Sequence, residues 1–191
     1  MTTRPATILA ALALPTAALA QYEITIDVEN PTLLPGESTT VTMLAGFDPS
    51  KYAIAAVMTD FVASTGSVGL SDAAVVAPMN GPGTSAGAPS ATGYDGILAG
   101  QTNFHSTYAD STNPIPFWEV TYTAPMEVMA PFDIDLSTMT TKYDVYVERS
   151  SSLSESRLAE LTEGSATIHV IPAPASASLL ALGLLAMRRR R

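Results

Sequence analysis

The 191-residue chain contains no cysteine, two histidines and one tryptophan. The absence of cysteine excludes disulfide bonds, thiolate metal sites and cysteine nucleophiles. A domain without disulfides depends on its hydrophobic core, and a body of about 150 residues can bury about two-thirds of its unfolded surface. We therefore expect one domain, because the chain is too short for two such cores.

Basic side chains are scarce in the middle of the chain. All 18 acidic residues lie between Glu23 and Glu163, and only four basic residues lie among them, which gives this segment a net charge of −14. Such a charge would repel the phosphates of a nucleic acid, so no nucleic-acid partner is expected. The sequence also has no P-loop, dinucleotide-binding fingerprint, zincin helix or set of zinc ligands, and nothing in it requires a cofactor.

The N-terminal segment has the pattern of a secretion signal. Residues 1–20 carry one arginine, then an apolar stretch, then a small-x-small tripeptide, with Ala18 and Ala20 directly before Gln21. This pattern predicts cleavage between Ala20 and Gln21 and export of the remainder. The alternative is an N-terminal membrane anchor, which the shortness of the apolar stretch disfavours.

The C-terminal segment combines an apolar run with a basic end. Residues 175–187 carry no charge and are rich in leucine and alanine. As a helix with a rise of about 1.5 Å per residue they would span about 20 Å, which is short of the roughly 30 Å hydrocarbon core of a bilayer. A basic cluster would hold this end on the cytoplasmic side of a membrane and place the acidic body outside. It consists of Arg188, Arg189, Arg190 and Arg191.

Residues 172–191 resemble a PEP-CTERM sorting signal, in which a short proline motif precedes an apolar helix and a terminal arginine cluster. The matching proline motif is Pro172-Ala173-Pro174, with Ala173 where the family has glutamate, and its IPAP form is similar to variants of planctomycete-type proteins. The resemblance implies an exported protein that is held transiently in the inner membrane and processed near this motif by an exosortase. It would then reach the cell surface or the extracellular space. A permanent tail anchor is the alternative.

Between these ends, residues 21–171 contain several short stretches in which apolar and polar side chains alternate. Such alternation is typical of strands with one buried face. The stretches are residues 22–28, 39–45, 116–124, 132–136, 142–148 and 165–171. Residues 52–63 are largely apolar, with Asp60 as their one charged residue, and are compatible with a central strand or a short helix; their position between expected strands favours the strand. Short strands separated by turns, such as the one at Pro35-Gly36, predict an all-β fold, an antiparallel β-sandwich of the immunoglobulin-like type.

Two stretches of the body lack this alternation. Residues 78–96 are rich in glycine, proline, alanine and serine and are expected to form a long loop. Residues 154–163 are expected to form one short helix or turn before Gly164.

The opening of the body resembles secreted bacterial sandwich domains of the cohesin and carbohydrate-binding group. The resemblance rests on residues 24–48, ITIDVENPTLLPGESTTVTMLAGFD, in which a Pro-Gly turn joins two amphipathic strands. It implies a cohesin-like antiparallel β-sandwich and supports the fold that the alternation predicts.

Residues 83–87 have the G-x-S-x-G spacing of a nucleophile elbow around Ser85. That motif works at a turn between a strand and a helix, whereas this copy lies in the expected loop. A catalytic triad would also need His105 or His169 as its base, and His169 lies on an expected strand. We therefore predict no catalytic residue. The rival hypothesis is a secreted hydrolase of esters or polysaccharides that uses Ser85 or a pair of carboxylates.

Several acidic side chains could form a calcium site, because carboxylate oxygens are ligands that Ca²⁺ prefers. Asp133 and Asp135 share one face of an expected strand, and Asp110, Asp144 or Glu148 could approach them in the fold. The sequence has no EF-hand or Asp-rich loop spacing, so a solvated outer face is the preferred interpretation.

Four aromatic residues could form a platform for sugar rings. Trp118 and Tyr122 share one face of an expected strand and are assigned to the core. Tyr143 and Tyr146 lie on a later strand, where Tyr146 shares its face with acidic residues and is the better exposed candidate.

The sequence thus predicts a signal peptide at residues 1–20, a β-sandwich at 21–171 and a sorting tail at 172–191. The expected function is non-catalytic. We predict a binding or structural module of the cell envelope or an extracellular matrix, whose partner is an extracellular polysaccharide or another protein.

Overall fold

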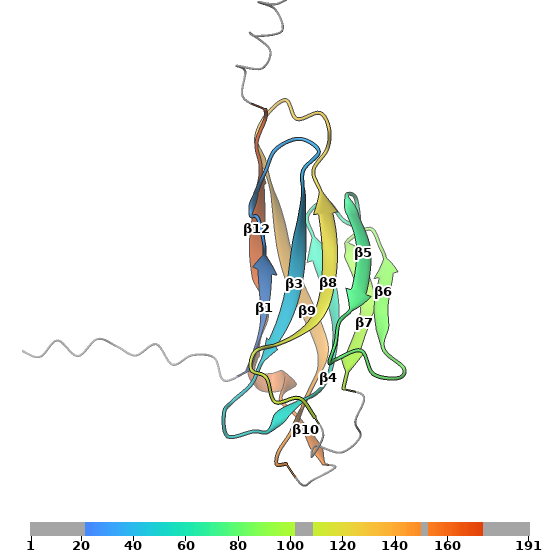
Figure 1. The fold of residues 1–191 in the computed structure, drawn as a ribbon, viewed down its shortest axis with the longest axis vertical. Helices are drawn as coiled ribbons and strands as arrows, with labels where there is room; N and C mark the ends of the chain where they lie inside the picture. Colours follow the sequence, from blue (N-terminus) through green and yellow to red (C-terminus); the bar gives the residue numbers. More distant parts are fainter. Residues whose placement is uncertain (1–21, 102–108, 150–152, 174–191) are drawn as a thin grey trace, which may run out of the picture.

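The computed structural model describes residues 22–101, 109–149 and 153–173. These residues form two β-sheets packed face to face, with sheet A in front of sheet B in Figure 1. The predicted all-β sandwich is confirmed. The expected signal peptide, Gln21, His105, Pro174 and the remainder of the tail lie outside the described residues.

Sheet A consists of β1 (Tyr22–Val28), β3 (Ser38–Gly46), β5 (Leu70–Val75), β8 (Ile115–Thr123) and β11 (Leu161–Thr162). From edge to edge its order is β11-β1-β3-β8-β5. The long strands pair antiparallel, and the two-residue β11 pairs in parallel with the start of β1.

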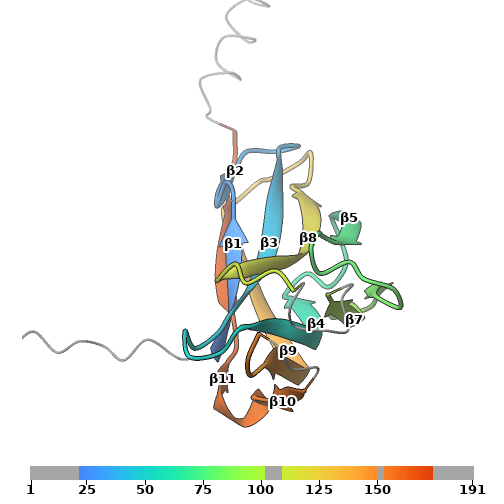
Figure 2. The ribbon, with the colours of Figure 1, turned by 60° about the horizontal axis from the view of Figure 1, so that its bottom comes forward.

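Sheet B consists of β2 (Thr32–Leu33), β4 (Ala53–Ala63), β6 (Ser85–Pro89), β7 (Gly93–Gly100), β9 (Phe132–Tyr146), β10 (Ser154–Ser156) and β12 (Ser165–Val170). Its order is β2-β12-β9-β4-β7-β6, and β10 pairs with the end of β9. Figure 2 shows β10 and β11 at one end of the sandwich and β2 toward the other end.

The alternation read from the sequence decides which side of each strand faces the core. Ile24 and Ile26 of β1 are buried and lie opposite Ala45 and Met43 of β3, which are buried as well. The residues between them face outward and are polar or half-exposed. One face of each sheet is therefore apolar, and stacking the two faces removes both from water.

A bulge in β8 brings two neighbouring aromatic residues into the core. The register between β3 and β8 shifts once, so that Phe117 and Trp118 are both fully buried. The Trp118 ring centroid lies 5.1 Å from that of Phe61, and its indole N–H donates to the Ala86 carbonyl oxygen at 3.0 Å. The prediction that Trp118 and Tyr122 belong to the core is confirmed, since both are at most 2% exposed.

The expectation of a long loop over residues 78–96 is wrong. This stretch contains β6 and the start of β7, which pair antiparallel at the edge of sheet B. Alanine and glycine occupy much of β6, so no alternation of apolar and polar residues marks it. A Cβ at Gly87 would lie 2.9 Å from the Asp95 carbonyl oxygen, so the missing side chain permits this close approach.

Two further expectations are corrected. Residues 132–136 and 142–148 do not form separate strands, because β9 runs continuously for 15 residues through the threonine-rich segment between them. The expected helix or turn at 154–163 consists of β10, a three-residue 3₁₀ helix at Leu158–Glu160, and β11. In the described parts of the chain, the structure contains no helix long and apolar enough to cross a membrane.

Candidate binding face

The outer side of sheet B carries a row of apolar side chains across three neighbouring strands. Met58 of β4 lies opposite Leu98 of β7 and Lys142 of β9. One step along the strands, Met139 of β9 lies opposite Asp60 and is 60% exposed. We call the outward side chains of β4, β7 and β9 the sheet B face. Its apolar members are Met58, Val62, Leu98 and Met139.

Charged groups lie among these apolar side chains. The Lys142 Nζ lies 3.2 Å from the Asp144 Oδ2, and the lysine side chain is about half exposed. Asp60 lies on β4 between Met58 and Val62, and its Oδ1 accepts a hydrogen bond of 2.7 Å from the Gly96 N–H. Exposed apolar side chains beside polar and charged groups are a common composition of a protein-binding surface.

A groove of about 290 Å³ lies at one end of the sheet B face. Its floor is made of small residues, because Ala56 lies opposite Gly100 on one side and Asp144 on the other. The segment before β6 forms one wall: the Gly81 N–H donates to the Gly100 carbonyl oxygen, and the Thr84 hydroxyl donates to the Gly81 carbonyl oxygen. The groove thus exposes backbone and short side chains that an extended ligand can approach closely.

Gln101 fixes the rim of the groove. Its Nε2 donates to the carbonyl oxygens of Ile54 and Asp110, both at 2.8 Å, and its Oε1 accepts from the Asp110 N–H at 2.6 Å. A single side chain therefore ties the end of β7 to β4 and to the segment that follows residue 108. These hydrogen bonds preorganise the rim of the groove for a ligand.

The prediction that Tyr146 is an exposed aromatic residue is wrong. Tyr146 is 7% exposed, because Ala53 of β4 and Ala109 pack against it. This burial raises the pKa of its hydroxyl. Tyr143 is also fully buried, so none of the four aromatic residues that the sequence offers for a sugar platform presents its ring to solvent.

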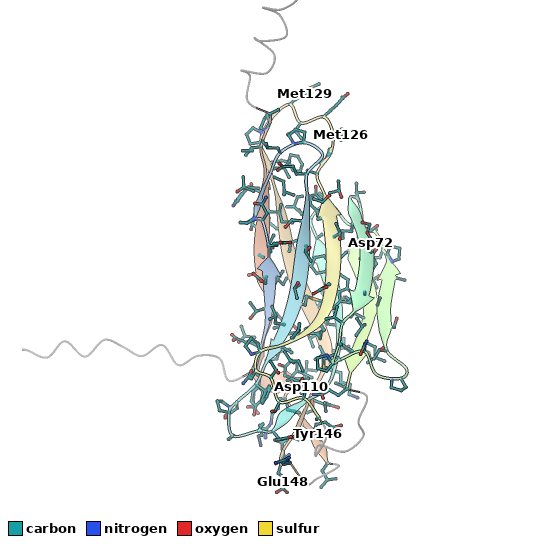
Figure 3. The ribbon with its side chains drawn as sticks, in the orientation of Figure 1. Asp72, Asp110, Met126, Met129, Tyr146 and Glu148 are labelled. Carbon is teal, nitrogen blue, oxygen red and sulfur yellow. The ribbon has the colours of Figure 1, made fainter. Side chains whose placement is uncertain are left out.

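The acidic residues proposed for calcium do not gather. The Asp133 Oδ1 lies 2.7 Å from the His169 Nδ1, and the Asp135 Oδ1 accepts a hydrogen bond from the Thr167 hydroxyl at 3.1 Å. Figure 3 shows Asp110 and Glu148 at the other end of the sandwich from the start of β9. Among the described residues, no three His, Asp or Glu side chains are placed to share a metal ion.

Asp110 and Asp144 have other partners as well. The Asp110 carboxylate accepts hydrogen bonds from the Thr112 hydroxyl and N–H, which lower its pKa. Asp144 pairs with Lys142. These local partners are typical of a solvated polar surface, which is the interpretation that the sequence favoured.

Ser85 and His169 lie far apart in sheet B. Ser85 begins β6 at one edge, and three strands, β7, β4 and β9, separate β6 from β12, which carries His169. The Ser85 Oγ accepts a hydrogen bond from the Gly87 N–H, and His169 pairs with Asp133. The G-x-S-x-G match is therefore part of an edge strand and not of a strand-to-helix elbow, and these residues form no triad.

Sequence reasoning missed the apolar residues of the sheet B face. In residues 53–63 nearly every side chain is apolar, so the period of two that separates inside from outside is hidden. The one signal was Asp60, whose parity marks Met58 and Val62 as outward-facing.

No protein-family model matches the chain, and no curated protein sequence is significantly similar to it. Among solved structures, the chain is similar to the seventh ScaB type I cohesin of Pseudobacteroides cellulosolvens, with 16% identity, a TM-score of 0.54, and coverage of 78% of this chain and 92% of the cohesin. A cohesin in a cohesin–dockerin complex from Clostridium thermocellum has 14% identity and a TM-score of 0.49, over 79% of this chain and 99% of that one. The likeness to the ScaB cohesin shows that this chain has the fold of a cohesin module.

Proposed function

We propose that this chain is an exported, non-catalytic β-sandwich module that binds a protein partner through the sheet B face. The observation that carries the proposal is the row of apolar side chains on an open face, with Met139 60% exposed and Lys142 beside it. Exposed apolar side chains beside charged groups favour a protein as the occupant.

A protein partner is preferred to a polysaccharide because of the kind of side chain that is exposed. Sugar rings are commonly held by stacking on exposed aromatic rings. In the described parts of the chain, the exposed large hydrophobic residues are all aliphatic or methionine. Methionine adapts its shape to a partner surface, which suits a protein contact.

The module is proposed to be exported by the signal peptide at residues 1–20 and sorted by the tail at 172–191, with an exosortase as the processing partner and the inner membrane as a transient location. One observation supports this reading of the tail. β12 ends at Val170, and Ile171 still donates its N–H to the Leu33 carbonyl oxygen, whereas Ala173 is exposed. Cleavage at the proline motif would therefore remove no residue of a strand.

Binding is tested by capture with matched variants of the full chain. Leu98 on the sheet B face and Leu44 on the outer face of sheet A are both half-buried and face outward, so L98D and L44D make the same change on opposite sides. Bead-bound protein is exposed to the secreted and envelope proteins of its host, and captured protein is quantified by mass spectrometry. We expect L98D to reduce capture of the partner at least about tenfold and L44D to leave it unchanged.

Equal capture by L98D and L44D would exclude the sheet B face as the binding surface. Retention of the chain on insoluble host polysaccharide, again lost only in L98D, would replace the protein partner by a glycan. Hydrolysis of ester or glycan substrates that disappears in S85A would overturn the non-catalytic assignment.

The tail is tested by measuring the mass of the C-terminal peptide of protein purified from its host. A peptide that ends within residues 172–175 supports processing by an exosortase. An intact Arg191 would instead indicate a permanent anchor.

A further inference from the structure

One end of the sandwich, which we call the tip, is built from three chain segments. They are the turn at 34–37 between β2 and β3, the loop at 125–131 between β8 and β9, and residues 171–173 after β12 (Figure 1). The Gly36 N–H donates to the Pro125 carbonyl oxygen at 3.2 Å, and the Ile171 N–H donates to the Leu33 carbonyl oxygen at 2.9 Å. These bonds join the three segments into one surface.

The tip exposes large apolar side chains. Met126 is 82% exposed and Met129 is 96% exposed, and Figure 3 shows both at the extreme end of the molecule. Ile171, in the third segment of the tip, is 39% exposed. The eight residues at 124–131, APMEVMAP, contain one charged side chain, Glu127. Val128 packs against the core, which anchors the loop while the two methionines face solvent.

The sequence places an apolar run directly after this surface. Residues 175–187 carry no charge, and only three residues lie between Ile171 and Ala175, which is four steps along the chain. Even a fully extended chain covers only about 14 Å over four residues. If the apolar run enters a bilayer, the tip is therefore the part of the body that faces the lipid headgroups.

We propose that the tip docks on the membrane surface, with Met126 and Met129 inserted at the boundary between headgroups and acyl chains. The proposal rests on the proposed insertion of residues 175–187. Flexible apolar side chains on a protruding loop gain free energy when they leave water at this boundary. The body carries a net charge of −14, so anionic lipids would not attract it, and the contact is apolar and insensitive to salt.

The test uses site-specific fluorescence of the full chain in vesicles of phosphatidylcholine. The native sequence has no cysteine, so E127C places a single fluorophore between the two methionines without changing them. L158C places the same fluorophore at the opposite end of the sandwich, on the 3₁₀ helix. Quenching by lipids brominated in their acyl chains reports contact with the bilayer. A third variant adds M126S and M129S to E127C.

We expect strong quenching of the label at 127, little quenching at 158, and a fall of at least about threefold at 127 when both methionines are serine. Equal thermal unfolding temperatures of the three variants would show that the fold is intact. A chain that stays with the vesicles while its label at 127 is not quenched would overturn docking of the tip and leave insertion of the tail standing. A chain that does not stay with the vesicles would overturn both. A label at 127 that is already shielded before vesicles are added would assign the tip to a second copy of the chain.

Discussion

Tyr143 offers the sharpest test of how the two sheets are held together. It lies in β9 of sheet B, and its hydroxyl donates to the Gly46 carbonyl oxygen of sheet A at 2.6 Å, with the Glu23 carbonyl oxygen 3.3 Å away. Burial, with the nearby Glu23 charge and Tyr22, raises the pKa of this hydroxyl, so it stays a proton donor over the usable pH range. Y143F removes this donor and keeps the ring that meets Tyr22 edge to face.

The expected loss of stability follows from the carbonyl oxygen that is left behind. Because Tyr143 is fully buried, no water can replace its hydroxyl, and an unsatisfied buried polar group costs about 1–3 kcal/mol. For a domain of this size, each kcal/mol lowers the unfolding temperature by about 2–4 °C. The m-value should not change, because the area that unfolding exposes is the same.

Urea unfolding followed by tryptophan fluorescence measures this loss directly. Trp118 is the only tryptophan of the chain and is fully buried, so its emission reports the core. Y122F is the matched control. Tyr122 is 2% exposed, and its hydroxyl has no hydrogen-bond partner among the described residues, so we expect a change below about 0.5 kcal/mol. Equal stabilities of Y143F and Y122F would refute the idea that this bond couples the sheets.

Two further predictions concern glycine and acid stability. G93A should lower the free energy of unfolding by about 3 kcal/mol or more in the same assay, because Gly93 has φ of +142° and a Cβ would lie 2.1 Å from a carbonyl oxygen of β4. The control G83A adds a Cβ with no neighbour within 4 Å and should lower it by only about 1 kcal/mol. Equal losses in the two variants would contradict this steric account. Hydrogen bonds from Lys51 and then Arg157 lower the pKa of Glu155 below its ordinary value of 4.5, so its contribution to stability is present above that pH and is lost below it. The unfolding temperature of E155Q should therefore lie below that of the native protein at pH 7, and the difference should shrink as the pH falls below 4.5; a difference that stays constant with falling pH would exclude this cause.

Local alternation was sufficient to predict the sandwich and most of its core. Strands such as β1 and β3 bury one face and expose the other, and their sequences record that difference residue by residue. The sequence of β6 shows no such alternation, because this edge strand is rich in alanine and glycine. Its position is set by its pairing with β7 and by the hydrogen bond that the Trp118 indole N–H donates to the Ala86 carbonyl oxygen. Pairing between distant segments is not visible in a local pattern.

Tyr146 shows a second limit of the same kind. Its parity with Asp144 correctly indicates the outer side of β9, yet the segment around Ala109 and Asp110 covers it. That cover is held by Gln101, which bonds to both the Asp110 N–H and its carbonyl oxygen. Parity gives the side of a sheet, whereas exposure depends on which loop returns to that side.

The two proposed surfaces occupy different parts of the molecule. The strands run along the long axis, so the tip lies at one end and the sheet B face lies along one side (Figure 1). A body docked by Met126 and Met129 would keep Leu98 and Met139 accessible to a partner in solution. L98D should therefore lower partner capture without changing lipid quenching, and the paired methionine-to-serine change should do the reverse. If either change affected both readouts, one surface would have to serve both contacts, and the separation of roles along the axis of the sandwich would be wrong.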